Sequence, residues 1–126
     1  MEKSFEEKFS EARAAVSAVS PQQANALMEK YPDTIFIDPR DADDIKSTTG
    51  IIPGALNVPL NAISETPENE LPGELSSYSR HIITACQGGP MGALAAHALK
   101  QRGYSNVAFI DGGTQSWLDA GYSTAR

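Results

Sequence analysis

The chain has 126 residues, with 10 basic side chains against 16 acidic ones and a net charge of −6 at pH 7. Hydrophobic residues make up 40% and charged residues 21%, which is ordinary for a globular protein and disfavours disorder or a disulfide scaffold. This length leaves room for one domain, and the acidic balance disfavours nucleic acid as a partner. One cysteine and two distant histidines form no recognisable metal-ligand spacing, so we expect neither a metal nor a cofactor.

No stretch of the sequence approaches the roughly 18 apolar residues of a membrane span. The first residues are acidic and polar, unlike a secretory signal. We therefore expect a cytoplasmic protein that makes no membrane contact. That compartment is reducing, which suits a lone thiol that has to stay reduced.

The first predicted element is an amphipathic helix over residues 4–19. It belongs to an N-terminal arm of residues 1–19, in front of a domain that spans residues 20–126. Its apolar side chains recur every three or four residues, as such a helix requires: Phe5, Phe9, Ala12, Val16 and Val19. Because the polar face is mostly acidic, we expect the helix to pack on the body of the domain rather than on a membrane surface.

A second helix and a strand are predicted next. Ser20, Pro21 and Gln23 provide a serine N-cap, a proline in the first turn and a glutamine three residues after the cap, so a helix begins here. Tyr31-Pro32 ends it, because the residue before a proline disfavours helical geometry. Residues 34–38 form a short apolar run typical of a strand that is covered on both faces.

The middle of the chain predicts little regular structure. A short helix is expected over residues 41–46 and a short strand over 55–58. Residues 59–79 are rich in Pro, Ser, Glu and Asn, which is typical of a surface excursion. At most, this excursion holds short helices around 60–63 and 73–78.

The last third alternates strands and helices. Strands are predicted over residues 81–85 and 106–110, with a helix over 93–102 between them and a final helix that carries Trp117. This alternation predicts an α/β fold, a mostly parallel twisted sheet of about four to five short strands with helices on both faces.

The loop that begins at Cys86 carries the strongest sign of chemistry. It follows a buried-type strand, and ligand sites of open parallel sheets lie where such strands end. Gly88, Gly89 and Gly92 have no Cβ, so successive backbone N–H groups can turn toward the sulfur. Pro90 suits the first turn of the next helix, whose positive end stabilises an anion such as a thiolate. A buried cysteine that acts as a small hydrophobic residue stays open as the alternative.

Five motifs, in order and between about Ser20 and Tyr122, resemble those of the rhodanese family of sulfurtransferases. Two precede the cysteine: Ile35–Arg40 resembles a hydrophobic strand that ends in D-x-R, and Ile52–Pro59 is similar to I-P-G-A-x-N-x-P. Cys86–Met91 has the six-residue length of the family's active-site loop. The remaining two follow it: Gly103–Val107 resembles G-Y-x-N-V, and Asp111–Trp117 matches G-G-x-x-x-W.

The resemblance implies a rhodanese-like fold and a sulfurtransferase or sulfur carrier, which takes up sulfane sulfur as a persulfide and passes it to a thiol or other nucleophilic acceptor. It makes Cys86 the nucleophile and assigns substrate binding to the residues that follow: Gln87, Gly88, Gly89, Pro90, Met91 and Gly92. Asp38 and Arg40 match D-x-R and are expected to support the site, although a surface ion pair or helix cap stays open. The implied partners are a small sulfur donor and a thiol acceptor, a protein thiol included.

Two positions depart from the family pattern. Many active members carry an arginine at the last loop position, where this chain has Met91, and often a histidine where it has Ile51. A loop without a cationic side chain binds a dianion such as thiosulfate less well. A non-catalytic binding or sensing module therefore stays open as an alternative.

Two further interpretations concern the phosphatases and the histidines. A tyrosine-phosphatase or arsenate-reductase relative is disfavoured, because such loops need an arginine that closes around a tetrahedral oxyanion. His97 is interpreted as a packing residue of the helix after the loop, and His81 is expected near the opposite end of the sheet from Cys86.

Overall fold

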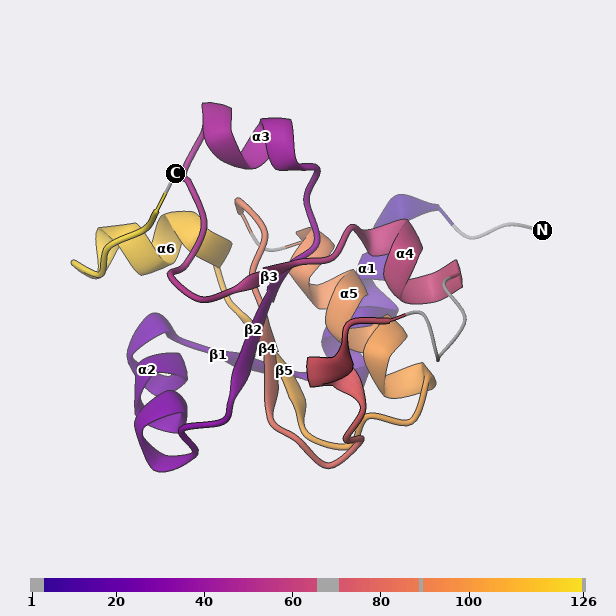
Figure 1. Cartoon of the computed structure of the whole chain (residues 1–126). Helices are drawn as coiled ribbons and strands as arrows, with labels where there is room; N and C mark the ends of the chain where they lie inside the picture. Colours follow the sequence, from indigo (N-terminus) through magenta and orange to yellow (C-terminus); the bar gives the residue numbers. More distant parts are fainter. Residues whose placement is uncertain (1–3, 66–70, 89, 126) are drawn as a thin grey trace.

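The computed structural model describes residues 4–65, 71–88 and 90–125, and its centre is a five-stranded sheet (Figure 1). In sheet order the strands are β1 (Ser17–Val19), β5 (Val107–Ile110), β4 (Ile82–Thr84), β2 (Ile35–Asp38) and β3 (Leu56–Asn57). Every neighbouring pair in this sheet is parallel. The predicted α/β fold is therefore confirmed.

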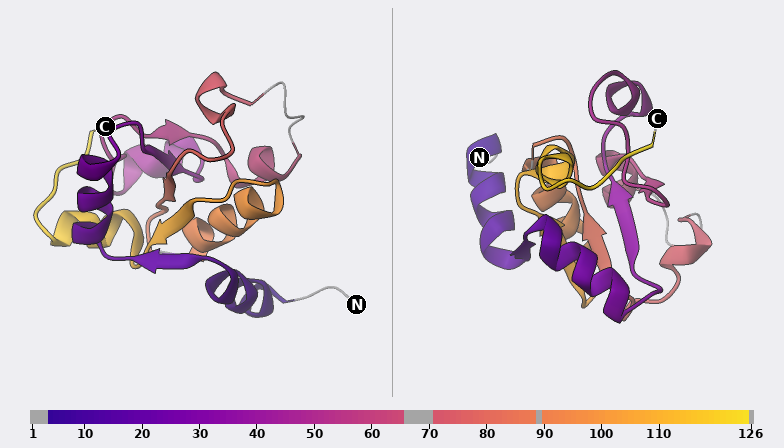
Figure 2. Two further views of the ribbon diagram at one scale, coloured as in Figure 1. Left: turned by 90° about the horizontal axis from the view of Figure 1, so that it is seen from below. Right: turned by 90° about the vertical axis from the view of Figure 1, so that its left-hand side faces the viewer.

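Helices cover both faces of the sheet (Figures 1 and 2). One face carries α1 (Phe5–Ala15), α4 (Leu60–Glu65) and α5 (Pro90–Gln101), and the other carries α2 (Pro21–Lys30) and α6 (Gly113–Asp119). The short helix α3 (Ala42–Ser47) stands beyond the carboxyl ends of the strands, and a 3-10 turn, η2, covers Gly73–Leu75. Among the described residues, no helix has the length and apolar character needed to cross a membrane.

The N-terminal segment differs from its prediction. The first helix ends at Ala15, and Ser17–Val19 form the edge strand β1, which pairs with β5. The predicted helix over residues 4–19 is therefore too long at its C-terminal end, where the structure has a strand. Pairing with β5 outweighs the helical spacing of the apolar side chains there. The helix itself packs on α5 with Ala12 fully buried, which confirms the expected packing on the body of the domain. The division of the chain at residue 19 stays a prediction.

The second helix begins and ends where the sequence predicts. Ser20 Oγ accepts a hydrogen bond from the Gln23 N–H at 3.1 Å, and Gln23 Oε1 accepts one from the Ser20 N–H at 2.8 Å. These two bonds satisfy backbone donors that a helix start leaves unpaired. The helix ends at its C-cap Tyr31, directly before Pro32.

The core lies on both faces of the three central strands. Every residue of β2, β4 and β5 is buried, as the apolar runs predict. Successive side chains alternate between the faces. Ile37 and Phe109 belong to the cluster under α1, α4 and α5, while Phe36, Ile83 and Ile110 belong to the cluster under α2 and α6. Trp117 joins the second cluster and packs edge-on against Phe36, at 5.8 Å between ring centroids.

The topology leaves one divergence point between two central strands. After β2 the chain turns to β3 on one side, and after β4 it passes through α5 to β5 on the other side. Ligand sites of open parallel sheets lie where the connections diverge in this way. The residues at this point are Asp38 at the end of β2 and Cys86 shortly after the end of β4.

Candidate active site

Cys86 lies in a pocket at this divergence point. The Ala85 N–H donates to the Ile37 carbonyl at 3.0 Å, which extends the pairing of β2 and β4 to the residue before the cysteine. Cys86 is the single cysteine of the chain, and only 3% of its surface is exposed. The pocket beside it measures about 300 Å³ and is lined from two sides, by Arg40, Asp44 and Thr48 and by Cys86, Gln87, Gly88, Pro90 and Met91.

The residues after the cysteine form the start of a helix. Helix α5 begins at Pro90, three residues before the predicted start at residue 93, so that Met91 and Gly92 lie in its first turn. A proline fits there because the first N–H groups of a helix have no partner within the helix. The site therefore receives the positive end of a 12-residue helix, which favours a thiolate or another anion nearby.

The predicted binding residues differ in exposure. Gln87 and Gly88 are exposed, Pro90 and Met91 are partly buried, and Gly92 is buried. Gly89 lies outside the described residues. The predicted cradle of backbone N–H groups around the sulfur therefore stays a prediction.

The first turn of helix α5 lies against the strand that precedes the cysteine, and a Cβ at Gly92 would fit there at ordinary contact distance. A Cβ on Gly92 would lie 3.4 Å from the Cys86 backbone nitrogen and 3.6 Å from the Thr84 carbonyl oxygen. Thr84 Oγ1 donates a hydrogen bond to the Gly92 carbonyl at 2.5 Å. This hydrogen bond ties the first turn of α5 to the end of β4.

A second helix start holds the carbonyl groups of the loop. The Thr114 N–H donates to the Cys86 carbonyl at 2.7 Å, and the Gln115 N–H donates to the Gln87 carbonyl at 3.1 Å. Gly113 has a φ of +65°, and a Cβ there would lie 2.6 Å from the Cys86 carbonyl oxygen. The match of this segment to G-G-x-x-x-W does not by itself predict this contact between Gly113 and the cysteine loop. The contact follows from the sheet order. Because β4 and β5 are neighbouring parallel strands, the loops that follow them lie side by side.

Asp38 and Arg40 form a buried ion pair. Arg40 Nε donates to Asp38 Oδ1 at 3.0 Å and Arg40 Nη2 to Asp38 Oδ2 at 2.7 Å, and the two residues are 2% and 4% exposed. The alternative of a surface ion pair or helix cap is therefore wrong, since the N-cap position of α3 belongs to Asp41. The guanidinium also donates to Thr48 Oγ1, Thr49 Oγ1 and the Gly50 carbonyl, at 3.0 to 3.1 Å. This network fixes one wall of the pocket.

An asparagine clamps the turn that carries the ion pair. Asn57 Nδ2 donates to the Asp38 carbonyl at 3.0 Å and to the Arg40 carbonyl at 2.7 Å. Asn57 belongs to the I-P-G-A-x-N-x-P motif, but the sequence reasoning gave it no role. Its position on β3 beside β2 explains the contact, since Asp38 and Asn57 are partners in the sheet register.

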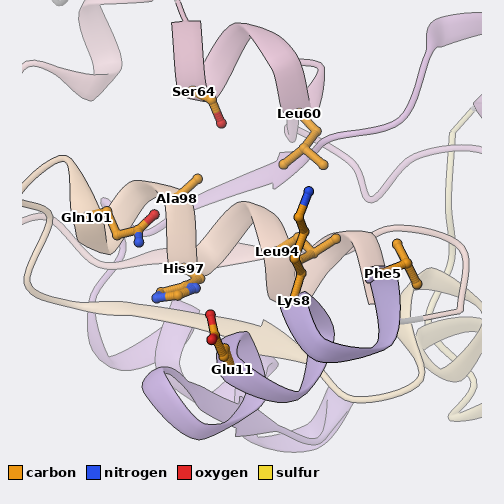
Figure 3. Close-up of a pocket in the computed structure, with 9 residues that line it drawn as sticks. All are labelled: Phe5, Lys8, Glu11, Leu60, Ser64, Leu94, His97, Ala98 and Gln101. Carbon is orange, nitrogen blue, oxygen red and sulfur yellow. The ribbon is translucent and has the colours of Figure 1, made fainter. Parts of the chain in front are cut away.

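The two histidines lie away from the Cys86 pocket, since neither of them lines it. A groove of about 540 Å³ runs between α1, α4 and α5, and in it the His97 ring faces the Glu11 carboxylate (Figure 3). His81 precedes β4 and stacks on Tyr31 with 4.0 Å between ring centroids, whereas Cys86 follows the same strand. The expected position of His81, away from Cys86, is confirmed.

Comparison with known proteins identifies the family. The rhodanese-like domain model matches residues 20–120. Human thiosulfate:glutathione sulfurtransferase is 25% identical over 114 residues, which cover 84% of this chain and 96% of that protein. A structure from Rhodopseudomonas palustris CGA009, described as a protein of unknown function and possible tyrosine phosphatase, is 25% identical with a TM-score of 0.84 and covers 99% of this chain and 96% of its own. The polysulfide-sulfur transferase homodimer of Wolinella succinogenes is 23% identical with a TM-score of 0.75, over 96% of this chain and 86% of its own. The chain belongs to the rhodanese-like domain family.

Proposed function

We propose that this protein is a sulfurtransferase or sulfur carrier that works through a persulfide on Cys86. The observation that carries the proposal is the position of the chain's single cysteine, in a pocket at the divergence point of the sheet and beside the start of α5. The sulfurtransferases among the similar proteins support it at the level of the family.

The proposed chemistry consists of two displacements at sulfur. The Cys86 thiolate attacks the outer sulfur of a donor, the donor's S–S bond breaks, and the remaining fragment leaves with the electron pair. That fragment is sulfite when the donor is thiosulfate and a thiolate when the donor is an organic persulfide. An acceptor thiolate then attacks the terminal sulfur of Cys86, and the Cys86 thiolate returns as the leaving group. Each step conserves charge and needs no external oxidant.

The surrounding residues prepare the cysteine for this chemistry. The positive end of α5 favours the thiolate, the persulfide and the departing anion, because each of them is negatively charged. Pro90, Met91 and the exposed loop residues Gln87 and Gly88 line the space in which donor and acceptor would bind. The buried pair of Asp38 and Arg40 acts as support, since it positions the opposite wall.

The non-catalytic binding or sensing module remains the alternative. One observation favours it: the described part of the loop has no cationic side chain, and the nearby Arg40 guanidinium is bonded to the Asp38 carboxylate. A phosphatase function has less support, because a phosphate ester needs a guanidinium that is available to its oxyanion.

We place the protein in the cytoplasm, where small thiols and protein thiols can both serve as acceptors of the sulfur.

Whole-protein mass spectrometry tests the proposal. The protein is incubated with thiosulfate, or with glutathione persulfide, and then freed of the donor. We expect a mass gain of one sulfur, ~32 Da, which a reducing agent or an acceptor thiol removes.

Cys86→Ser is the matched control for this experiment. The variant should gain no sulfur and transfer none, while its melting temperature changes little because the substitution is nearly isosteric. A folded wild-type protein that gains no sulfur from either donor would contradict the proposal and favour the binding module.

A further inference from the structure

The wall of the Cys86 pocket opposite the loop carries an acidic side chain. Asp44 on helix α3 lines the pocket together with Arg40 and Thr48, and it is exposed. It is the one acidic residue among the described residues that line this pocket. Its immediate neighbour Asp43 does not line the pocket.

The backbone at Asp44 is tied to the buried ion pair. Thr48 Oγ1 donates to the Asp44 carbonyl at 2.5 Å, and Arg40 Nη1 donates to Thr48 Oγ1 at 3.1 Å. Arg40 is itself held by Asp38, so this chain of bonds runs from the end of β2 to helix α3. The backbone that carries the Asp44 side chain is therefore held beside the pocket.

Of the three charged side chains in and beside the pocket, two neutralise each other and the third does not. The Arg40 guanidinium is paired with Asp38 at 2.7 Å, and both groups are buried. The Asp44 carboxylate takes part in no hydrogen bond or ion pair with the described residues. A donor that approaches Cys86 therefore meets one uncompensated negative side chain.

We infer that Asp44 sets the charge preference for the sulfur donor, and this inference rests on the proposed function. Asp44 disfavours dianions such as thiosulfate and favours persulfides of small thiols that carry an ammonium group. The physical reason is Coulombic, because a dianion feels twice the repulsion of a monoanion, whereas an ammonium group is attracted. Asp44 is thus a specificity-determining residue of the pocket.

The first test needs no sulfur transfer. Iodoacetate and iodoacetamide both alkylate Cys86 and have nearly the same size, but only iodoacetate is negatively charged. The ratio of their rate constants is measured for the wild type, Asp44→Asn, Asp44→Lys and the control Asp43→Asn, which alters the net charge equally. At low salt, Asp44→Asn should raise the iodoacetate-to-iodoacetamide ratio about twofold to threefold and Asp44→Lys more, which is the size expected for the loss of one charge that acts across a solvent-filled pocket.

The control and the salt dependence complete this test. Asp43→Asn should leave the ratio unchanged, and the effect of Asp44→Asn should fade in 0.5 M salt, where screening is strong. An unchanged ratio in folded Asp44→Asn, or an equal change in Asp43→Asn, would overturn the inference.

The second test compares two donors. For thiosulfate, Asp44→Asn should raise kcat/KM about fivefold at low salt, because the donor carries two charges. For cysteamine persulfide, kcat/KM should stay level or fall. If both donors respond equally, the inference fails while sulfur transfer stands. If neither donor is used by any variant although the alkylation ratio responds to Asp44→Asn, the proposed function fails and the charge effect stands.

Discussion

The Cys86 pocket and the groove between α1, α4 and α5 are built in different ways. The groove is larger, about 540 Å³ against about 300 Å³, but it is lined by side chains of three helices. The pocket is smaller, and its walls are fixed by backbone hydrogen bonds to the loop and by a buried ion pair. The difference teaches that the volume of a hollow does not identify the candidate site in this fold. The candidate site is marked instead by the ends of the central strands and by buried hydrogen bonds and ion pairs.

The polar groups of the groove are attached differently from those of the pocket. Lys8, Glu11 and His97 project from helices into the groove, whose rim includes the exposed ring of Phe5 (Figure 3). The pocket instead holds Cys86, the proposed nucleophile, two residues after the end of the central strand β4. We therefore expect substitutions that support the pocket to cost more stability and activity than substitutions in the groove or on α1.

The largest effect is expected from breaking the buried ion pair. Arg40→Met leaves the Asp38 carboxylate buried without its partner, which should lower the free energy of unfolding by about 3 to 5 kcal/mol. The matched control is Arg13→Met on α1, which removes an exposed pair with Asp111 at 3.3 Å. Its cost should be about 1 kcal/mol or less. Urea denaturation measures both, and equal losses would contradict the claim that the pocket wall is the more strongly built region.

A smaller effect is expected from adding one methyl group beneath the loop. In Gly113→Ala the new Cβ would lie 2.6 Å from the Cys86 carbonyl oxygen, so backbone has to shift. We expect a loss of about 2 to 4 kcal/mol, from overpacking and positive φ together, and slower sulfur transfer.

Gly121→Ala separates these two causes. Gly121 also has a positive φ, +96°, but a Cβ there would meet nothing within 4 Å. Its loss of stability should be about 1 to 2 kcal/mol, from the backbone conformation alone, with sulfur transfer unchanged. A Gly113→Ala protein that matches Gly121→Ala in stability and activity would show that the loop tolerates the displacement.

The smallest effect is expected in the groove. His97→Asn removes the imidazole but keeps a polar side chain of similar reach on α5. Because His97 does not line the Cys86 pocket, persulfide formation should change less than twofold. The free energy of unfolding should change by about 0.5 kcal/mol or less. A tenfold loss of sulfur transfer in a folded His97→Asn protein would mean that groove and pocket are coupled through α5.

Sequence reasoning predicts those parts of the fold that have a strong local signal. The apolar runs of β2, β4 and β5 identify buried strands, and the capping residues Ser20 and Gln23 locate the start of α2. The edge strand β1 escapes prediction, because three residues are too few for a period and the strand exists only through its pairing with β5. Local propensity carries no information about that partner.

In the candidate site, too, some features have a local sequence signal and others depend on strand pairing. The loop from Cys86 is visible in the sequence as a strand, a cysteine and a glycine-rich helix start. The contact of Gly113 with the loop and the burial of Arg40 with Asp38 depend on which strands become neighbours in the sheet. The position of Asp44 in the pocket is equally a product of topology, since nothing in its local sequence separates it from Asp43. These contacts therefore depend on the pairing of strands that are distant in the sequence, which local sequence patterns do not predict.

The edge strand also matters for where the chain can be cut. The family match begins at residue 20, but the sheet begins with β1 at Ser17, and α1 covers α5 in front of it. A shortened chain that starts at Ser20 would keep every residue of the family match and yet lose this strand. It would uncover the backbone groups of β5 that now bond β1, an open edge next to Phe109 and Ile110. Such an edge is a template for pairing with other chains, so trimming to the family boundary would favour aggregation over a smaller working domain.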